Sequence, residues 1–230
     1  MKVEILEFVE GAKRAGGLTV IIDVFRAFSV ECYAFDSGAS RVIATADAEH
    51  AFILKQSYKN AVLAGERNEK KIEGFDIGNS PTEILKADLN GKTFIHTTTA
   101  GTQGLVNATR ADLVITGSLV NSAAIARYIN HINPETVSLV AMGYRAEQSA
   151  GEDLLCAELI SSYIKNEKPD ISKKIESLRE NDGRRFFRPE NIDFSPPSDF
   201  FLCTMTDRFN FILRAERRHD GNIELFRIDI

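Results

Sequence analysis

Thr19–Ser29 reads TVIIDVFRAFS, and this segment carries the pattern that decides the fold. A short β-rich run ends at an acid, Asp23, and a helical pattern begins directly after Arg26. A strand that leads straight into a helix is the unit of a parallel sheet, because parallel strands need crossover connections. The same alternation of short strands and helices continues to about residue 165.

Outward from this segment, apolar β-rich runs predict strands and helical periodicity predicts helices. We expect strands at Thr19–Val24, Arg41–Ala44, Ala61–Ala64, Thr93–His96, Leu113–Thr116 and Val137–Met142. We expect helices at Ala27–Asp36, Ala48–Tyr58, Thr102–Ala108, Ser122–Asn130, Glu152–Lys165 and Ser172–Leu178. Two further β-rich runs flank Asp220-Gly221 and predict a hairpin, at Phe209–Arg214 and Ile223–Ile228.

Matching landmarks recur at an offset of about 70 residues, which suggests an internal duplication. Val42–Thr45 aligns with Val114–Gly117, and the apolar run before Gly65 aligns with the run before Gly143. We therefore predict an α/β fold of two similar three-layer α/β/α halves, with mainly parallel sheets and a C-terminal β-hairpin. The predicted units are a first repeat, a second repeat and an extension that packs back on both, at residues 1–90, 91–168 and 169–230.

Composition excludes several classes of partner. The 230 residues include 28 Lys+Arg and 33 Asp+Glu, and the basic residues are scattered, so we expect no nucleic-acid or membrane partner. No apolar run has the length of a transmembrane span, and the first residues alternate in charge where a signal peptide would be apolar. Three widely spaced cysteines suit a reducing compartment, so we expect a cytoplasmic protein. Whether the chain forms a homodimer is left open.

Several catalytic classes lack their defining residues. The cysteines form no CxxC pair, and no arginine stands six positions after any of them, which excludes a structural zinc site and a thiol phosphatase. The four histidines form no metal-binding set. Lys86 stands where a P-loop would need its first glycine, and Phe25 stands where a haloacid-dehalogenase-type phosphatase would have a second Asp.

The residues after each predicted strand are the candidates for chemistry, because ligands of such folds bind at the carboxyl ends of the strands. Asp23 and Arg26 could hold a metal and an anion side by side, or could serve only at a helix start. The turn Thr97–Thr102 offers hydroxyls and amides that can cradle phosphate, or an ordinary helix cap. The candidates in that turn are Thr97, Thr98, Thr99, Gly101 and Thr102.

Two loops add further charged residues. Long ordered loops are usually functional, and the loop from Gly65 to Pro81 carries Glu66, Arg67, Asp76, Asn79 and Ser80. Ser80 followed by Pro81 is also a good helix entry, so Ser80 could act only as a cap. After the last strand of the second repeat come Arg145 and the adjacent acids Glu152 and Asp153.

Taken together, these strand ends supply carboxylates, arginines and a threonine-rich turn. Carboxylates favour a hard cation such as Mg²⁺, and arginines favour a substrate with several negative groups. Metal-assisted attack of water on a phosphate ester fits both features. We expect Asp23 or Glu66 to act as the base and Arg26 to offset charge on the phosphoryl oxygens. A covalent phosphoryl group on Asp23 is the alternative.

Five motifs in this order resemble the 2-phosphosulfolactate phosphatase family. They are Asp23-Val-Phe-Arg-Ala, Gly65-Glu-Arg, Gly74-Phe-Asp-x-Gly-Asn-Ser-Pro81, Thr97-Thr-Thr-x-Gly-Thr102 and Glu152-Asp-x-x-Cys-Ala157. The likeness runs from about residue 1 to residue 166. This sequence departs from the pattern at Ala100, where Asn is usual, and at Glu69, where Gly is common.

The resemblance implies a Mg²⁺-dependent phosphoric monoester hydrolase that converts (2R)-2-phospho-3-sulfolactate to 3-sulfolactate and phosphate, a step of coenzyme M biosynthesis. It also implies a fold with two similar α/β/α halves. Carried over by motif, the metal ligands would be Asp23, Glu66, Asp76 and Asp153. Arg26 and the Thr97–Thr102 turn would hold phosphate, Asn79 and Ser80 would bind the substrate, and Arg67 and Arg145 would face its sulfonate or carboxylate.

Two alternatives stay open at this point. The substrate could be another small phosphorylated 2-hydroxy acid. The protein could also be a two-lobed receptor of small organic anions without catalysis, although converging carboxylates would repel such a ligand unless a metal is bound.

Overall fold

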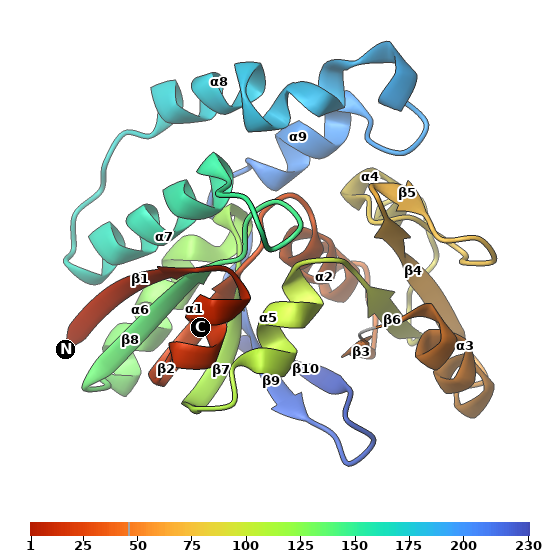
Figure 1. The fold of residues 1–230 in the computed structure, drawn as a ribbon, viewed down its shortest axis with the longest axis horizontal. Coiled ribbons are helices and arrows are strands. Elements are labelled where there is room, and N and C mark those ends of the chain that lie inside the picture. Colours follow the sequence, from red (N-terminus) through yellow and green to blue (C-terminus); the bar gives the residue numbers. More distant parts are fainter. Residues whose placement is uncertain (46) are drawn as a thin grey trace.

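The centre of the molecule is one mixed β-sheet, seen in a computed structural model that describes residues 1–45 and 47–230 (Figure 1). Across this sheet the strands follow the order β1-β8-β2-β7-β9-β10-β3-β6-β4-β5. Their bounds are β1 (Lys2–Glu7), β2 (Gly17–Ile22), β3 (Arg41–Ala44), β4 (Ala61–Arg67), β5 (Lys70–Lys71), β6 (Thr93–Thr97), β7 (Ala111–Gly117), β8 (Thr136–Ala141), β9 (Phe211–Arg217) and β10 (Ile223–Asp229).

Helices cover both faces of this sheet. The α-helices are α1 (Phe8–Arg14), α2 (Ala27–Asp36), α3 (Ala48–Ser57), α4 (Pro81–Ile84), α5 (Gly101–Asn107), α6 (Ser122–Ile132), α7 (Gly151–Ile164), α8 (Ser172–Glu180) and α9 (Pro197–Cys203). Short 3₁₀ helices are η1 (Leu119–Asn121), η2 (Asp182–Phe187) and η3 (Pro189–Asn191). Asp47 begins α3 by accepting a hydrogen bond from the amide of His50, an ordinary cap.

The predicted α/β class, the mainly parallel pairing and the C-terminal hairpin are all confirmed. Each expected strand and helix is present, with its ends within three residues of the prediction. Strand β1 and helix α1 were not expected. Strand β1 lies at the edge of the sheet, and its side chains are exposed or only partly buried. Because Lys2–Glu7 therefore includes charged residues, it lacks the apolar pattern by which a strand is predicted.

The two expected repeats share their strands. Strand β2, from the first predicted repeat, lies between β8 and β7 of the second. In return, β6 of the second lies between β3 and β4 of the first. One sheet therefore runs through both, and the internal duplication and the three-unit division stay predictions.

The hairpin of β9 and β10 joins two groups of parallel strands, one made of β1, β8, β2 and β7 and the other of β3, β6 and β4. β9 pairs antiparallel with β7, and β10 pairs antiparallel with β3, so the two groups have opposite sense when followed along the sheet. Five steps separate β2 from β6 in the strand order. At roughly 20–25° of twist per step, the strand direction turns by on the order of 100° over that distance. This twist lets the carboxyl ends of both groups face one cleft.

Among the residues that the structure describes, three clusters of buried apolar side chains hold the layers together. One lies under α1, α2 and α5, a second lies under α6, α7 and α9, and a third packs α3 against β4 and β6. Helix α2 is buried along most of its length and occupies the centre of the molecule (Figure 1). No helix in residues 1–45 and 47–230 combines the length and hydrophobicity needed to cross a bilayer.

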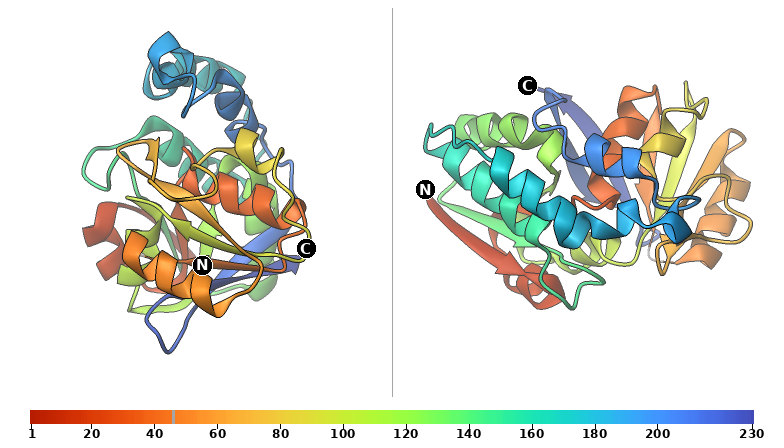
Figure 2. Two further views of the ribbon diagram at one scale, coloured as in Figure 1. Left: turned by 90° about the vertical axis from the view of Figure 1, so that its right-hand side faces the viewer. Right: turned by 90° about the horizontal axis from the view of Figure 1, so that it is seen from above.

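The segment from α8 to α9 forms an arch above the rest of the molecule (Figures 1 and 2). Helix α8 packs on α7, and α9 packs on α4, so the arch rests on both sides of the molecule. Between them, η2 contacts both α8 and α9. This segment was almost without signal in the sequence, and it lies over the cleft described next.

Candidate active site

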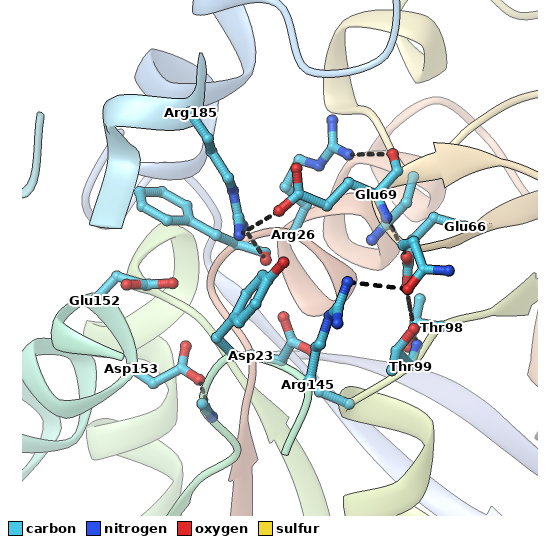
Figure 3. A pocket seen from close by; sticks show the side chains of 16 residues that line it. Asp23, Arg26, Glu66, Glu69, Thr98, Thr99, Arg145, Glu152, Asp153 and Arg185 are labelled. Atoms are coloured by element: carbon cyan, nitrogen blue, oxygen red, sulfur yellow. Dashed lines mark hydrogen bonds and ion pairs between the residues drawn. The ribbon is translucent and has the colours of Figure 1, made fainter. Parts of the chain in front are cut away.

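A cleft lies below η2, where the chain leaves β2, β4, β6 and β8 (Figure 3). It encloses about 560 Å³ of empty space, including open solvent at its mouth. In the view of Figure 3, Glu152 and Asp153 lie on one side, and Glu66, Thr98 and Thr99 on the other. The lining residues are Asp23, Phe25, Arg26, Glu66, Asn68, Glu69, Asn79, Thr98, Thr99, Ala100, Gly143, Tyr144, Arg145, Glu152, Asp153 and Arg185.

Asp23 lies in the wall of the cleft, directly after β2. Its Oδ1 accepts a hydrogen bond from the amide of Ala27 at 3.2 Å, at the start of α2. A Cβ atom on Gly101 would lie 3.0 Å from Asp23 Oδ2, so the absence of a side chain lets α5 begin close to this carboxylate. The pKa of Asp23 is raised to about 6, chiefly by burial and in part by the nearby Glu66 carboxylate, although the hydrogen bond from Ala27 lowers it. Asp23 can therefore exchange a proton near neutral pH.

Glu152 and Asp153 begin α7 and share the opposite wall. Both oxygens of Asp153 accept backbone hydrogen bonds, from Val24 and Gly143 at 2.8 Å each, so this residue ties the ends of β2 and β8 together. Glu152 Oε2 is buried and, within the described chain, has no hydrogen-bond partner. Burial raises the pKa of Glu152 to about 7, although the nearby Arg185 lowers it. Burial, followed by the neighbouring Glu152, also raises the pKa of Asp153 well above its usual value.

Glu66 is held by three donors from its own chain. Its Oε1 accepts from the amide and the hydroxyl of Thr99 at 2.9 and 2.8 Å, and its Oε2 accepts from the amide of Glu69 at 2.8 Å. A methyl group on Gly65 would collide with the carbonyl oxygen of Thr97, so only glycine allows β4 to approach β6 this closely. The threonine turn expected to cradle phosphate thus already binds a carboxylate of the protein.

Arg185 reaches the cleft from η2. Its Nη1 donates to Glu69 Oε1 at 3.2 Å, and its Nη2 donates to the carbonyl oxygen of Phe25 at 3.0 Å. Its guanidinium lies over the ring of Tyr144, 5.5 Å from the centroid. In Figure 3 it stands above the carboxylates that line the cleft. Arg185 is therefore a cation fixed by two hydrogen bonds and an aromatic ring.

Arg145 lies at the lower edge of the cleft in Figure 3. Its Nη2 donates to Asn68 Oδ1 at 2.9 Å, and its guanidinium lies 5.3 Å from the centroid of Tyr144. Arg185 also lies over the ring of Tyr144, so this ring contacts one arginine from η2 and one from the loop between β8 and α7. Two guanidinium groups thus line the cleft near one aromatic ring, where a ligand with several negative groups can be held.

Arg26 lines the cleft, but much of its hydrogen-bonding capacity is used inside the protein. Its Nη1 donates to Asp199 Oδ2 at 2.6 Å and to the carbonyl oxygen of Phe194 at 2.7 Å. Asp199 Oδ1 accepts in turn from the hydroxyl of Ser80 and the amide of Thr82. The pair of Arg26 and Asp199 therefore fastens the arch to the turn after β2, and the expected role of Arg26 in binding phosphate stays a prediction.

Replacing Asp199 by alanine should lower the free energy of unfolding by about 3–5 kcal/mol, because it leaves the buried guanidinium of Arg26 without its partner. Urea denaturation measures this loss. Asp229→Ala is the matched control, because its ion pair with Arg227 is exposed and should contribute less than about 1 kcal/mol. Equal stabilities of the two variants would contradict the fastening role of Asp199.

The structure brings eight of the expected site residues to the cleft and leaves six outside its lining. Those in the lining are Asp23, Arg26, Glu66, Asn79, Thr98, Thr99, Arg145 and Asp153. Those outside it are Arg67, Asp76, Ser80, Thr97, Gly101 and Thr102. The position of Asp76 does not support a role as metal ligand, because its Oδ2 binds the Lys55 ammonium at 2.7 Å and the Leu63 amide at 2.8 Å.

Four of the other outlying residues have structural roles that explain their places. Ser80 caps α4 and donates to Asp199, so the alternative of a simple helix cap fits its contacts. Thr102 bonds to the hydroxyl of Thr98, and Thr97 is buried in β6. Arg67, which follows Glu66 on β4, donates a hydrogen bond from its guanidinium to the backbone oxygen of Glu66.

Sequence reasoning missed three charged residues of the cleft, namely Glu69, Glu152 as a candidate ligand, and Arg185. Glu69 stood out only as a departure from a family pattern, and Glu152 only as the neighbour of Asp153. For Arg185, the sequence offers only that it stands beside another arginine, Arg184. Nothing in the sequence says that η2 folds over the cleft, because that contact joins residues 160 positions apart.

The sequence model of one family, 2-phosphosulpholactate phosphatase, matches residues 4–187. This chain belongs to that family. The match includes β2, the threonine turn, the start of α7 and η2 with Arg185. The expected resemblance is therefore confirmed, and the family is one of phosphatases, that is, of phosphoric monoester hydrolases acting on a small phosphorylated compound.

Individual relatives within the family cover most of this chain. A protein of Caldanaerobacter subterraneus subsp. tengcongensis is 37% identical over 209 residues, which are 84% of this chain and 85% of the relative. A protein of Clostridium beijerinckii is 37% identical over 76% of this chain and 74% of its own length. A protein of Thermotoga petrophila is 32% identical over 84% of this chain and 86% of its own length. Each is named a probable 2-phosphosulfolactate phosphatase.

Proposed function

We propose that this protein is a Mg²⁺-dependent phosphatase that hydrolyses (2R)-2-phospho-3-sulfolactate to 3-sulfolactate and phosphate, a reaction of the kind used in coenzyme M biosynthesis. Membership of the family supports the reaction. The charge of the cleft supports the rest, and it is the observation that carries the proposal. The lining includes five carboxyl groups and three guanidinium groups. A substrate with phosphate, sulfonate and carboxylate groups needs further positive charge to bind there.

The acidic pair at the start of α7 fits a magnesium ion. Mg²⁺ prefers oxygen ligands and is usually held by one or two carboxylates together with waters and substrate phosphate oxygens. Glu152 and Asp153 would hold it, since among the described residues Glu152 Oε2 is buried without a hydrogen-bond partner, and the neighbouring Glu152 carboxylate helps to raise the pKa of Asp153. Among the described residues, no three side chains of the metal-binding types cluster closely enough to hold a metal alone. When bound, the ion would neutralise charge on the phosphoryl group.

Asp23 is the residue best placed to act as base. Glu66 has both oxygens engaged by internal donors, whereas Asp23 Oδ1 accepts one amide and Oδ2 faces the start of α5 in the cleft wall. The carboxylate of Asp23 would take a proton from the attacking water as the oxygen–phosphorus bond forms. The ester bond to the 2-oxygen of the substrate then breaks, and that oxygen takes a proton from solvent at the open mouth of the cleft.

The two arginines at the mouth would divide the remaining negative groups between them. Arg185 stands over the acidic side of the cleft and would offset charge on the phosphoryl oxygens in the transition state. Arg145, near Asn68, would bind the sulfonate or carboxylate. The three cysteines are free and buried, which suits the cytoplasmic location expected from the sequence.

Phosphate release from a panel of 2-phospho acids tests the proposal. Phosphosulfolactate should be hydrolysed at least about tenfold faster, in kcat/KM, than phospholactate, phosphoglycerate or phosphoglycolate, because one more anionic group meets an arginine. EDTA should lower the rate by about 100-fold or more, and added Mg²⁺ should restore it. Preference for another member of the panel would change the substrate but keep the chemistry. A folded protein that releases no phosphate from any of them would favour an anion receptor.

A further inference from the structure

A buried chain of three polar side chains runs beneath the cleft. Glu31 of α2 lies 3.0 Å from Nδ1 of His96, which belongs to β6. Nε2 of the same ring lies 3.1 Å from Oδ1 of Asn79, which lines the cleft. The side chains of His96 and Glu31 are only 1% and 2% exposed. The function proposed above does not use Glu31 or His96, and a buried ionisable pair in that position calls for a role.

The structure places Oδ1 of Asn79, which can only accept a hydrogen bond, against Nε2 of His96, so Nε2 is the donor. Burial raises the pKa of Glu31, while the hydrogen bond from His96 lowers it. A buried pair is stable when it is neutral overall, either as carboxylate with imidazolium or as carboxylic acid with neutral imidazole. In the imidazolium form both ring nitrogens carry hydrogen. In the neutral form the carboxylic acid of Glu31 donates to Nδ1, and the single ring hydrogen is on Nε2. In both forms Nε2 carries the hydrogen that Asn79 Oδ1 accepts.

This direction determines which end of the Asn79 amide is left for the cleft. Oδ1 is occupied by His96 behind the wall of the cleft. Within the described chain Nδ2 has no hydrogen-bond partner, and it is not among the polar atoms that are buried without one. The residue as a whole is 6% exposed, and that exposure is toward the cleft it lines. The amino group of Asn79 is thus presented to whatever binds there.

We propose that Glu31 and His96 are positioning residues that hold Asn79 with its NH₂ group toward the cleft, where it donates a hydrogen bond to an anionic group of the substrate. The ligand is recognised by its chemistry, a phosphoryl or sulfonate oxygen. The inference rests on the proposed function for the identity of that ligand. The fixed orientation of the Asn79 side chain, called the lock below, rests only on the contacts among Glu31, His96 and Asn79.

Asn79→Asp is the decisive variant, because it keeps the shape of the side chain but places a negative oxygen where the amino group stood. Binding of inorganic phosphate, measured by calorimetry, should weaken by at least about tenfold, and more than in Asn79→Ala. The KM for phosphosulfolactate should rise by a similar factor with a smaller change in kcat. An Asn79→Asp protein that binds phosphate like the wild type would overturn the proposal, since it would mean that the amino group of Asn79 donates no hydrogen bond to the anion.

The lock itself needs a variant that removes the pair without leaving a lone buried charge. Glu31→Leu combined with His96→Leu meets this requirement and leaves Asn79 free to rotate. Phosphate affinity should fall several-fold, less than in Asn79→Asp. Thr45→Val is the matched control, because among the described residues this buried hydroxyl has no hydrogen-bond partner, and the amide of Thr45 donates to the backbone oxygen of His96 and not to its ring. Wild-type affinity in the double variant would overturn the positioning role.

A spectroscopic signature tests the lock without any ligand. The ¹⁵N shift of Nε2 in His96 should show an attached hydrogen in the substrate-free protein, whatever the state of Nδ1. A bare Nε2 would overturn the proposal. Because neither this shift nor the phosphate titration depends on turnover, their results stand apart from those of the substrate panel, and a failure of the proposed reaction is distinguishable from a failure of the lock.

Discussion

Asp23→Asn should lower kcat by about a thousandfold or more and leave the protein folded. The asparagine keeps the size of the side chain and an oxygen for the Ala27 amide, but it has no carboxylate to take a proton from water. The variant also removes a carboxyl group whose pKa is raised by burial. Its stability should therefore equal or exceed that of the wild type above pH 6, where the buried charge is unfavourable.

Steady-state kinetics and thermal melting measure the two parts of this prediction. Asp76→Asn is a fitting control, because Asp76 stands in the loop that the sequence singled out but lies outside the cleft, beside Lys55. Its kcat should stay within about twofold of the wild type. A kcat near the wild-type value in Asp23→Asn would remove Asp23 from the reaction, whereas a loss in both variants would return Asp76 to the list of ligands.

Arg185→Gln should lower kcat/KM by about 100- to 1000-fold, the usual effect of removing a donor that stabilises charge in a transition state. Arg185 also lowers the pKa of Asp23 and of Glu152 through its positive charge. Without it both pKa values rise, so the acid limb of the pH–rate profile should shift to higher pH. The shift separates an electrostatic role from mere damage to the fold.

Arg184→Gln is the matched control for this variant. It changes the neighbouring residue of η2, which lies outside the lining of the cleft, and should leave the rate and the pH profile unchanged. The kcat/KM of Arg185→Lys should lie between those of Arg185→Gln and Arg184→Gln. A lysine keeps the charge but cannot bind Glu69 and Phe25 together as the guanidinium does. A normal pH profile in Arg185→Gln would exclude contact between this cation and the reacting groups.

The sequence was a good guide to local structure. Most strands are apolar runs between turn residues, and most helices show helical periodicity, so these elements could be predicted from their neighbours in the chain, whereas β1 and α1 could not. The order of the strands could not, because the exchange of β2 and β6 between the two groups depends on packing across the sheet. The same is true of η2, whose contact with Phe25 joins distant parts of the chain.

The candidate site shows a similar division. The motifs identified Asp23, Glu66 and Asp153 because a family pattern and a strand end coincide at each of them. They could not show that Glu66 and Asp153 also accept hydrogen bonds from backbone amides, because an acid that only binds a ligand and an acid that also organises the backbone look alike in sequence. The difference lies in which donors surround the carboxylate.

The place of the C-terminal hairpin has a consequence for how the chain can assemble. Strands β9 and β10 lie in the middle of the sheet, between β7 and β3, although they follow β1 to β8 along the chain. On the ribosome, the two parallel groups must therefore wait side by side with open inner edges until residues 211–229 emerge. Contacts between such distant segments form slowly. The cleft, which needs both groups, can take its shape only after synthesis has passed the hairpin, so no partly made chain should be active.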